Sequence, residues 1–195
     1  MCTSHDCDKH ALAFARFLLN FKVLYLVFTN NTVKMKTLKI ITTGGTIDKL
    51  YFDDLSDYQI GKPIIGELLN TYHVGFEFEV VPLLKKDSIY LTDEDRELIK
   101  QVIEKSDDQH FLITHGTDTM VETAQYLKSI EDKTIVLTGA LTPARFNSTD
   151  AIFNIGCAVA AVQTQPKGVW VIMSGLVWDP NHVRKNRKAN RFEEA

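Results

Sequence analysis

Residues 38–47 read Leu-Lys-Ile-Ile-Thr-Thr-Gly-Gly-Thr-Ile, an apolar run that passes into a polar turn with two glycines. The run has the length and the β-branched content of a buried strand. The same arrangement recurs in Phe-Leu-Ile-Thr-His-Gly-Thr-Asp at 111–118 and in Thr-Ile-Val-Leu-Thr-Gly-Ala at 134–140. Because ligands bind beyond the carboxyl ends of the strands in an open parallel sheet, we expect these three turns to converge on one crevice.

Outward from these strands, short β-rich runs alternate with segments of helical periodicity, which predicts a single α/β domain. We expect an open, mostly parallel sheet with helices on both faces, in a flavodoxin-like or Rossmann-like three-layer arrangement. Five strands are predicted: Leu38 to Thr42, Phe76 to Val81, Phe111 to Thr114, Thr134 to Thr138 and Val169 to Met173. Helices are predicted around Ile64 to Leu69, over Arg96 to Lys105 after a capping-box pattern that begins at Thr92, over Met120 to Lys128 and over Asp150 to Gln165. The polar span from Asp48 to Lys62 is predicted to be a mobile loop.

The composition favours small-molecule chemistry over binding to nucleic acid or to a membrane surface. The 195 residues are 45% hydrophobic and carry a formal net charge of -3. An acidic balance gives no general attraction to phosphate-rich partners. The basic run from Arg184 to Arg191 could form a nucleic-acid contact, but it is one short cluster without a recognition motif. We therefore expect no nucleic-acid partner.

The cysteines favour a reducing compartment, so a cytoplasmic location is predicted. Cys2, Cys7 and Cys157 are an odd number and do not form a disulfide framework. Cys2 and Cys7 also lie close to His5 and His10, but this cluster lacks both the spacing and the second half of known zinc sites. We expect no metal ion.

Residues 1–36 are predicted to be an N-terminal extension, separate from a domain at 37–195. Ala11 to Phe28 is apolar, but it is short for a membrane span, contains two charged residues and is not followed by a signal-peptide cleavage site. We expect no membrane partner. Met35 lies just before the first strand, which suggests that residues 1–34 come from a misread start.

Thr46 is a candidate functional residue, with its hydroxyl exposed at the tip of the first polar turn. Gly44 and Gly45 allow a sharp turn and a close approach of the backbone to a ligand, with amide N–H groups available as donors. The alternative is a turn that only ends the strand. A phosphate site is not indicated, because neither of the glycine-rich phosphate-binding patterns is present.

Thr117 and Asp118 follow the most apolar strand, and packing alone does not explain such a polar turn there. Asp118 could instead cap the following helix. A threonine hydroxyl is a weak nucleophile that needs a base, and a neutral lysine oriented by a carboxylate is one known solution. Lys185 is our candidate, because burial and neighbouring positive charges would lower its pKa. The alternative for Lys185 is a solvated basic tail.

These motifs resemble the two signatures of the bacterial-type L-asparaginase family. The matching residues are Thr-Thr-Gly-Gly-Thr-Ile at 42–47 and Thr-His-Gly-Thr-Asp-Thr-Met at 114–120. The resemblance extends from Leu38 to Asn190 and includes the segments 57–58, 87–88, 150–154 and 179–185. It implies conversion of L-asparagine to L-aspartate and ammonia, with L-glutamine as a second candidate substrate, without metal or organic cofactor, in a homodimer or homotetramer.

The resemblance also implies roles for individual residues. Thr46 would be the nucleophile and Tyr58 would lie beside it on a lid, while Thr117, Asp118 and Lys185 would form a second triad. Ser88 would hold the α-carboxylate of the substrate and Asp118 its amino group. The remaining expected substrate-binding residues are Asp87, Gly45 and Gly116.

Two features depart from the family pattern. Family members continue into a second, smaller domain that completes a neighbouring subunit's site with an acidic group, whereas this sequence stops at Ala195. Glu193 or Glu194 could reach a partner's crevice in a dimer. The lysine of the family is flanked by threonines, whereas Lys185 lies in an arginine-rich segment. The alternative function is therefore an amino-acid or amide sensor that has kept the pocket and turns over poorly.

Overall fold

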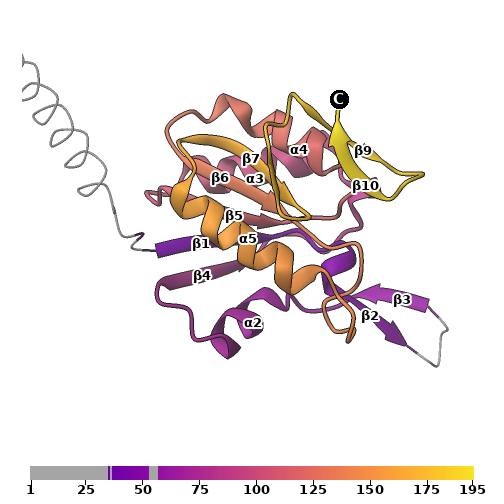
Figure 1. The fold of residues 1–195 in the computed structure, drawn as a ribbon. Helices are drawn as coiled ribbons and strands as arrows, with labels where there is room; N and C mark the ends of the chain where they lie inside the picture. The colour runs from indigo at the N-terminus through magenta and orange to yellow at the C-terminus, as the bar shows by residue number, and fades with distance from the viewer. Residues whose placement is uncertain (1–34, 36, 53–56) are drawn as a thin grey trace, which may run out of the picture. The chain divides into compact units, whose positions relative to one another are not determined.

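The computed structural model describes residue 35 and residues 37–52 and 57–195, and its main element is a six-stranded sheet (Figure 1). The strand order is β4-β1-β5-β6-β7-β8, with parallel pairing throughout except for the antiparallel pair of β7 and β8. The strands of this sheet are β1 (Thr37–Thr42), β4 (Glu77–Pro82), β5 (His110–Thr114), β6 (Thr134–Thr138), β7 (Gly168–Met173) and β8 (Leu176–Trp178). The open parallel sheet predicted from the sequence is confirmed.

The helices lie in the intervals where the sequence predicts them. They are α2 (Ile65–Thr71), α3 (Asp93–Glu104), α4 (Met120–Tyr126) and α5 (Ala151–Thr164), with 3-10 turns η1 (Thr46–Asp48), η3 (Ser88–Tyr90) and η4 (Leu127–Ser129). The capping box is present at the start of α3, where Thr92 Oγ1 accepts from the N–H of Asp95 and the Asp95 carboxylate accepts from the N–H of Thr92.

One prediction is wrong, and five strands of the described residues were not predicted. The described residues of the span from Asp48 to Lys62 do not form an irregular loop: β2 (Lys49–Phe52) pairs antiparallel with β3 (Asp57–Ile60). Besides β8, a second antiparallel hairpin made of β9 (Val183–Asn186) and β10 (Arg191–Glu194) follows the sheet. The cysteine and histidine cluster at 2–10 and the apolar segment at 11–28 lie outside the described residues, and the domain boundary at residue 37 stays a prediction.

Two apolar cores, one on each face of the sheet, explain why the central strands are apolar at every position. One core contains Ile40 and Leu112 and is covered by α2 and α5. The other contains Ile41 and Ile113 and is covered by α3, α4 and the β9–β10 hairpin. Figure 1 shows α5 in front of the sheet and α3 and α4 behind it. Since both faces are covered, the edge formed by the carboxyl ends of the strands is the place for a polar site.

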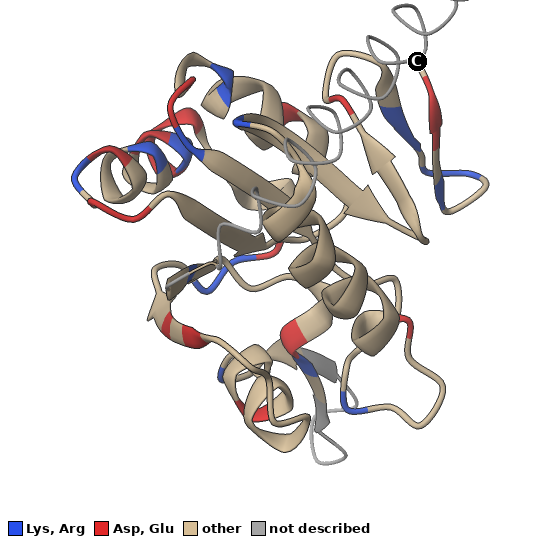
Figure 2. Ribbon diagram, turned by 60° about the vertical axis from the view of Figure 1, so that its left-hand side comes forward, with Lys and Arg blue, Asp and Glu red and all other residues tan. Residues whose placement is uncertain are grey.

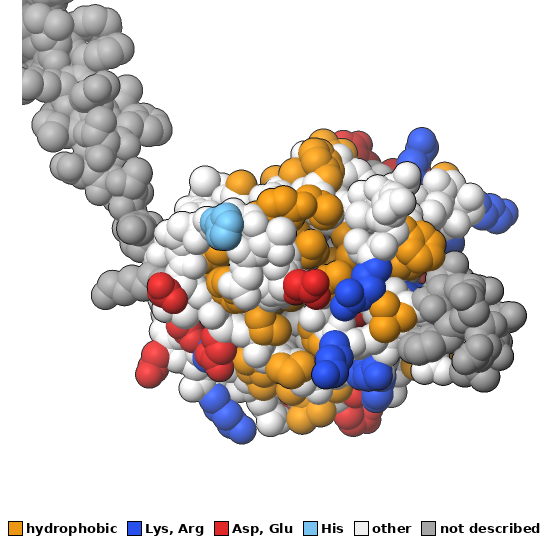
Figure 3. All heavy atoms as spheres, turned by 90° about the horizontal axis from the view of Figure 1, so that it is seen from below, with side chains coloured by type: hydrophobic (Ala, Val, Ile, Leu, Met, Phe, Trp, Pro, Cys, Tyr) orange, Lys and Arg blue, Asp and Glu red, His pale blue; other side chains and the backbone are white. Residues whose placement is uncertain are grey.

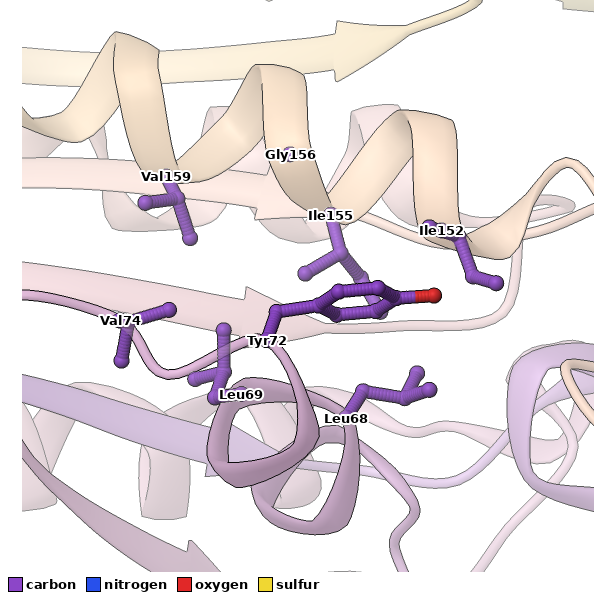
Figure 4. A pocket seen from close by; sticks show the side chains of 8 residues that line it. All are labelled: Leu68, Leu69, Tyr72, Val74, Ile152, Ile155, Gly156 and Val159. Carbon is purple, nitrogen blue, oxygen red and sulfur yellow. The ribbon is translucent and has the colours of Figure 1, made fainter.

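Helix α5 contains no Lys, Arg, Asp or Glu and is drawn without a charge colour in Figure 2. Between it and α2 lies a shallow apolar pocket of about 200 Å³ (Figure 4). The lining residues are Leu68, Leu69, Tyr72, Val74, Ile152, Ile155, Gly156 and Val159. Figure 3 shows hydrophobic side chains grouped on the face seen from below, where α2 lies in Figure 1. With no titratable group except a tyrosine, this pocket is not the place for amide chemistry. In the described part of the chain, no helix is long and apolar enough to cross a bilayer.

Candidate active site

The polar turns that follow β1, β5 and β6 converge, as the sequence predicts. The N–H of Thr43 donates to the carbonyl of Thr114 at 3.1 Å, and the Thr43 hydroxyl donates to the same oxygen at 3.0 Å. On the other side, the N–H of His115 donates to the carbonyl of Thr138 at 2.9 Å. The three strands are therefore still joined to one another just past their carboxyl ends.

Glycines allow the first two turns to touch. Gly45 has φ +86°, and a Cβ atom there would lie 2.5 Å from the Cα of Gly116. A Cβ atom on Gly116 would in turn lie 2.5 Å from Ser88 Oγ. Only glycine fits at either position, because real Cβ atoms do not approach other atoms so closely. Thr46 and Thr117, which follow the two glycines, thus lie on turns that touch each other, and Ser88 lies against the second turn.

Thr117, Lys185 and Asp118 form a compact group. Lys185 Nζ donates to Thr117 Oγ1 at 2.5 Å and lies 3.7 Å from Asp118 Oδ1. Thr117 is 5% exposed, and the side chain of Lys185 is 6% exposed. Lys185 is therefore not part of a solvated basic tail: the β9–β10 hairpin turns it inward onto β5.

The surroundings of Lys185 make its ammonium easier to deprotonate than that of an exposed lysine. Burial lowers the pKa of its ammonium below the ordinary value, although the nearby Asp118 carboxylate acts in the opposite direction. Phe192, opposite Lys185 in the β9–β10 register, contributes to this burial, and its ring centroid lies 5.8 Å from Nζ. A lysine with a lowered pKa and a hydroxyl within hydrogen-bond distance can act as a base.

Ser88 and Asp87 lie at the start of η3 but differ in their surroundings. Ser88 is 1% exposed, and its Oγ has no hydrogen-bond partner. Asp87 is already engaged, because its carboxylate forms an ion pair with Lys49 Nζ at 2.7 Å and accepts from the N–H of Ile89. Ser88 is therefore free to donate to a ligand, whereas Asp87 ties η3 to strand β2.

Fewer contacts are described around Thr46 than around Thr117. Thr46 opens η1, and none of the described side chains, which exclude those of residues 51–58, is hydrogen-bonded to its hydroxyl. The backbone of Tyr58 lies in β3, opposite Tyr51 of β2, while its side chain lies outside the described residues. Asp48, at the end of η1, accepts from the N–H of Ile64 through Oδ1, and burial raises its pKa to about 6.

Asp118 has a neighbour that the sequence analysis did not assign. Arg187 Nε lies 3.8 Å from Asp118 Oδ1, and Arg187 Nη2 donates to the carbonyl of Asp118 at 3.4 Å. Arg184 and Arg191 both form ion pairs with Glu193, which leaves Glu193 engaged inside its own hairpin. The basic run is thus used within the chain, and its position beside Asp118 could not be read from its composition.

The turn after β5 leads directly into helix α4, for which Asp118 is the alternative N-cap. Helix α4 begins after Thr119, and no side chain caps it, so Asp118 does not serve as its cap. The Thr119 hydroxyl instead donates to the carbonyl of Ser88 at 2.7 Å, which joins η3 to the turn after β5. Among the described residues, no group of three or more His, Cys, Asp or Glu side chains could hold a metal ion.

Asp150 and Asn154 explain why the third turn keeps its shape. The Asp150 carboxylate accepts from the N–H groups of Leu141 and Thr142, just beyond β6. Asn154 donates to the carbonyl of Gly139 at 3.0 Å and accepts from the N–H of Ser174 at 2.9 Å. These two side chains of the α5 region thus support the turns after β6 and β7 from within the chain.

Comparisons with known proteins identify the family of the chain. The family model described as "Asparaginase, N-terminal" matches residues 37–193. The chain is 31% identical over 192 residues to L-asparaginase 2 of Escherichia coli (strain K12), covering 83% of this chain and 50% of that protein. It is 30% identical over 177 residues to the glutaminase-asparaginase of Pseudomonas fluorescens biotype A, covering 82% of this chain and 49% of that protein.

A solved structure shows the same fold. L-asparaginase I from Vibrio cholerae O1 biovar eltor str. N16961 superposes with a TM-score of 0.70 at 25% identity, covering 82% of this chain and 51% of that chain. The chain spans about half the length of the relatives it matches.

Proposed function

The chain belongs to the asparaginase family, and on that premise we propose that it is an amidohydrolase that converts L-asparagine to L-aspartate and ammonia through a threonine acyl-enzyme. The observation that carries the proposal is the buried contact between Thr117 Oγ1 and Lys185 Nζ, beside the glycine contact that brings in Thr46. A hydroxyl nucleophile needs such a base, since it is weak on its own.

In the proposed reaction, Thr46 Oγ1 forms a bond to the side-chain amide carbon of asparagine. As this bond forms, the Thr46 hydroxyl loses its proton, which neutral Lys185 takes up through the Thr117 hydroxyl and later returns to the leaving nitrogen. Asp118 stabilises the ammonium while Lys185 holds the proton. The carbon–nitrogen bond then breaks, and the nitrogen leaves as ammonia after it has received a proton. Water attacks the ester that remains, which releases L-aspartate and restores the Thr46 hydroxyl.

Substrate recognition uses one hydroxyl without a partner and one partly exposed carboxylate. The Ser88 hydroxyl, buried and without a partner, donates to the α-carboxylate of the substrate. Asp118, whose side chain is 37% exposed, accepts from the α-amino group. Backbone N–H groups of the turns at Gly45 and Gly116 stabilise the developing oxyanion. Tyr58 comes from the β2–β3 hairpin next to Thr46, and Asp87 contributes indirectly by holding that hairpin to η3.

The proposal includes L-glutamine as a second substrate, because one of the relatives is named a glutaminase-asparaginase. It also includes a homodimer or homotetramer, in which a neighbouring copy closes the crevice. The cytoplasmic location predicted from the cysteines stays a prediction. Sedimentation equilibrium of the full chain measures the assembly directly, and a purely monomeric protein at enzyme concentrations would refute the assembly.

Ammonia release from L-asparagine, L-glutamine and small amides tests the reaction. Thr46→Ala, Thr117→Val and Lys185→Met should each lower kcat by about 10²-fold to 10⁴-fold, the usual effect of losing a nucleophile or a base. Thr164→Val is a matched control, since Thr164 is exposed and its hydroxyl donates only to carbonyls of its own helix α5. Circular dichroism confirms that the variants are folded.

Three results would contradict the proposal or part of it. Folded wild-type protein that releases no ammonia from any amide is not an amidohydrolase. Tight asparagine binding without turnover would instead indicate the sensor. Full activity in Lys185→Met would exclude the assigned base, even if the protein hydrolyses amides.

A further inference from the structure

His115 lies two residues before Thr117, is 0% exposed and has no role in the reaction described above. Its Nδ1 lies 2.7 Å from the carbonyl oxygen of Gly116, and its Nε2 lies 2.9 Å from Thr123 Oγ1. Burial lowers the pKa of the imidazole to about 4, so the ring is neutral at neutral pH. Because a carbonyl oxygen can only accept, the single ring proton belongs on Nδ1, and Nε2 accepts from the Thr123 hydroxyl.

The chain of hydrogen bonds continues to a permanent charge. Thr123 Oγ1 accepts from Arg96 Nε at 3.2 Å. Arg96 lies on α3, is 9% exposed and forms an ion pair with Asp93 at 2.8 Å. Arginine can donate but never accept, so the donors have only one possible order, from Arg96 to the Gly116 carbonyl. We call Arg96, Thr123 and His115 the relay.

The last acceptor of the relay belongs to the peptide bond that leads into Thr117. The carbonyl of Gly116 and the N–H of Thr117 lie in one plane and point in opposite directions, because the peptide is trans. Gly116 has no side chain to restrict its backbone, and Gly45 packs directly against it. A hydrogen bond to the carbonyl is therefore the means of fixing the direction of the Thr117 N–H.

We propose that the relay is a positioning device for the amide hydrolysis: it fixes the peptide between Gly116 and Thr117, and thereby the N–H and hydroxyl of Thr117. The inference rests on the proposed function. Filling space does not require these side chains, because a core packs equally well with apolar groups, whereas each polar group buried here needs a partner. All three side chains have a hydrogen-bond partner. The last bond is made to the Gly116 carbonyl, in the peptide that leads into Thr117, which the proposed reaction uses.

The kinetic test removes the middle member of the relay. Thr123→Val keeps the shape of the side chain but leaves His115 Nε2 without its donor. It should lower kcat by about tenfold to 100-fold, as misplacement of a reacting group does, while KM changes little. Thr123→Ser restores the hydroxyl and should recover most of kcat. Thr164→Val, the same substitution at a hydroxyl outside the relay, should leave kcat and KM unchanged.

Nuclear magnetic resonance provides a readout that does not depend on turnover. Long-range proton–nitrogen spectra should show His115 protonated on Nδ1 and unprotonated on Nε2 in the wild type. The amide resonance of Thr117 should shift in Thr123→Val and return toward its wild-type position in Thr123→Ser.

Several results would overturn the relay. They are a proton on Nε2, an unchanged Thr117 resonance in Thr123→Val, or wild-type kcat in that variant. A wild-type protein that hydrolyses no amide would refute the proposed function alone, because the spectra still decide whether the relay exists.

Discussion

The two halves of the crevice, one around Thr117 and one around Thr46, differ in how far their polar groups are already paired. Around Thr117, the hydroxyl accepts from Lys185, and the ammonium has Asp118 as an ion-pair partner. Around Thr46, the hydroxyl has no hydrogen bond in the described part of the chain, and Asp48 keeps one buried oxygen, Oδ2, without a partner.

The difference shows how two buried ionisable groups can serve one site in different ways. Burial shifts both toward the neutral form, since it lowers the pKa of Lys185 and raises that of Asp48. Lys185 has an opposite charge beside it, so it can take up a proton at moderate cost. Asp48 has no hydrogen-bond partner at Oδ2, and the charge of Arg145 offsets its burial only in part, so its charged form weakens the fold. The polar groups around Thr117 are thus already paired, whereas Asp48 Oδ2 near Thr46 is left without a partner among the described residues.

The largest effect should come from breaking the contact between the halves. Gly45→Ala places a methyl group 2.5 Å from Gly116 Cα at a backbone position with φ +86°. We expect the free energy of unfolding to fall by about 3 kcal/mol or more, from strain and overpacking, and kcat by at least about 100-fold. Urea unfolding and ammonia release measure the two effects. Gly75→Ala, which meets no atom within 4 Å, should change stability by less than about 0.5 kcal/mol. Wild-type turnover in Gly45→Ala would show that the halves need not touch.

The second prediction concerns the charge buried in the Thr46 half. Because the folded protein raises the pKa of Asp48 from 3.8 to about 6, it binds that proton more tightly than the unfolded chain does. Stability from this group is complete below pH 3.8 and is lost as the pH rises to about 6, a change of about 3 kcal/mol at most. Asp48→Asn should remove this dependence.

The test of Asp48 uses the difference between two unfolding curves. Other carboxylates, such as Asp87 and Asp95, have lowered pKa values and change stability in the opposite direction at lower pH. Subtracting the Asp48→Asn stability from that of the wild type at each pH between 4 and 8 cancels their contribution. A flat difference over this interval would mean that Asp48 is not shifted.

A smaller effect is expected at the helix that carries the first member of the relay. Thr92→Ala removes the side chain that accepts from the N–H of Asp95 at the start of α3. We expect a loss of about 1 kcal/mol in the free energy of unfolding, typical of a lost N-cap, with kcat unchanged. Thermal unfolding and ammonia release separate these outcomes. A matching fall in kcat would show that the Thr117 half tolerates less movement of α3 than we infer.

The smallest effect should lie outside both halves. Gly156 is exposed in the middle of α5, and a Cβ atom there would meet nothing within 4 Å. Gly156→Ala should therefore raise the free energy of unfolding by about 0.5 to 1 kcal/mol through the better helix propensity of alanine. The kcat of this variant should equal that of the wild type. A lower free energy of unfolding would mean that the pocket between α2 and α5 has less room than described.

Local sequence was sufficient to predict the central sheet and the residues of the two turns. Strands β5 and β6 are continuous apolar runs that end in glycine-containing turns, and such runs are recognisable without tertiary information. Strand β8 has only three residues, and β9 and β10 are mostly charged, with only Val183 and Phe192 buried. The polar composition of the span from Asp48 to Lys62 hid the β2–β3 pairing in the same way.

The contacts that complete the site could not be predicted, because they join residues far apart in the chain. The ion pair of Lys49 with Asp87 spans 38 positions, and the contact of Arg187 with Asp118 spans 69. Neither pair has a sequence signature. The same is true of the hydrogen bond from Arg96 to Thr123, which turns an ordinary helix residue into part of a buried network.

The lysine of the site is carried by the β9–β10 hairpin, which forms a sheet of its own rather than continuing the main one. Two-stranded hairpins have little stability by themselves, so this one is held by its packing, chiefly through Val183 and Phe192. Such an element can detach while the remainder of the protein stays folded. Heating should accordingly abolish activity at a lower temperature than that of global unfolding. Ligands that stabilise the hairpin should bring these two temperatures closer together.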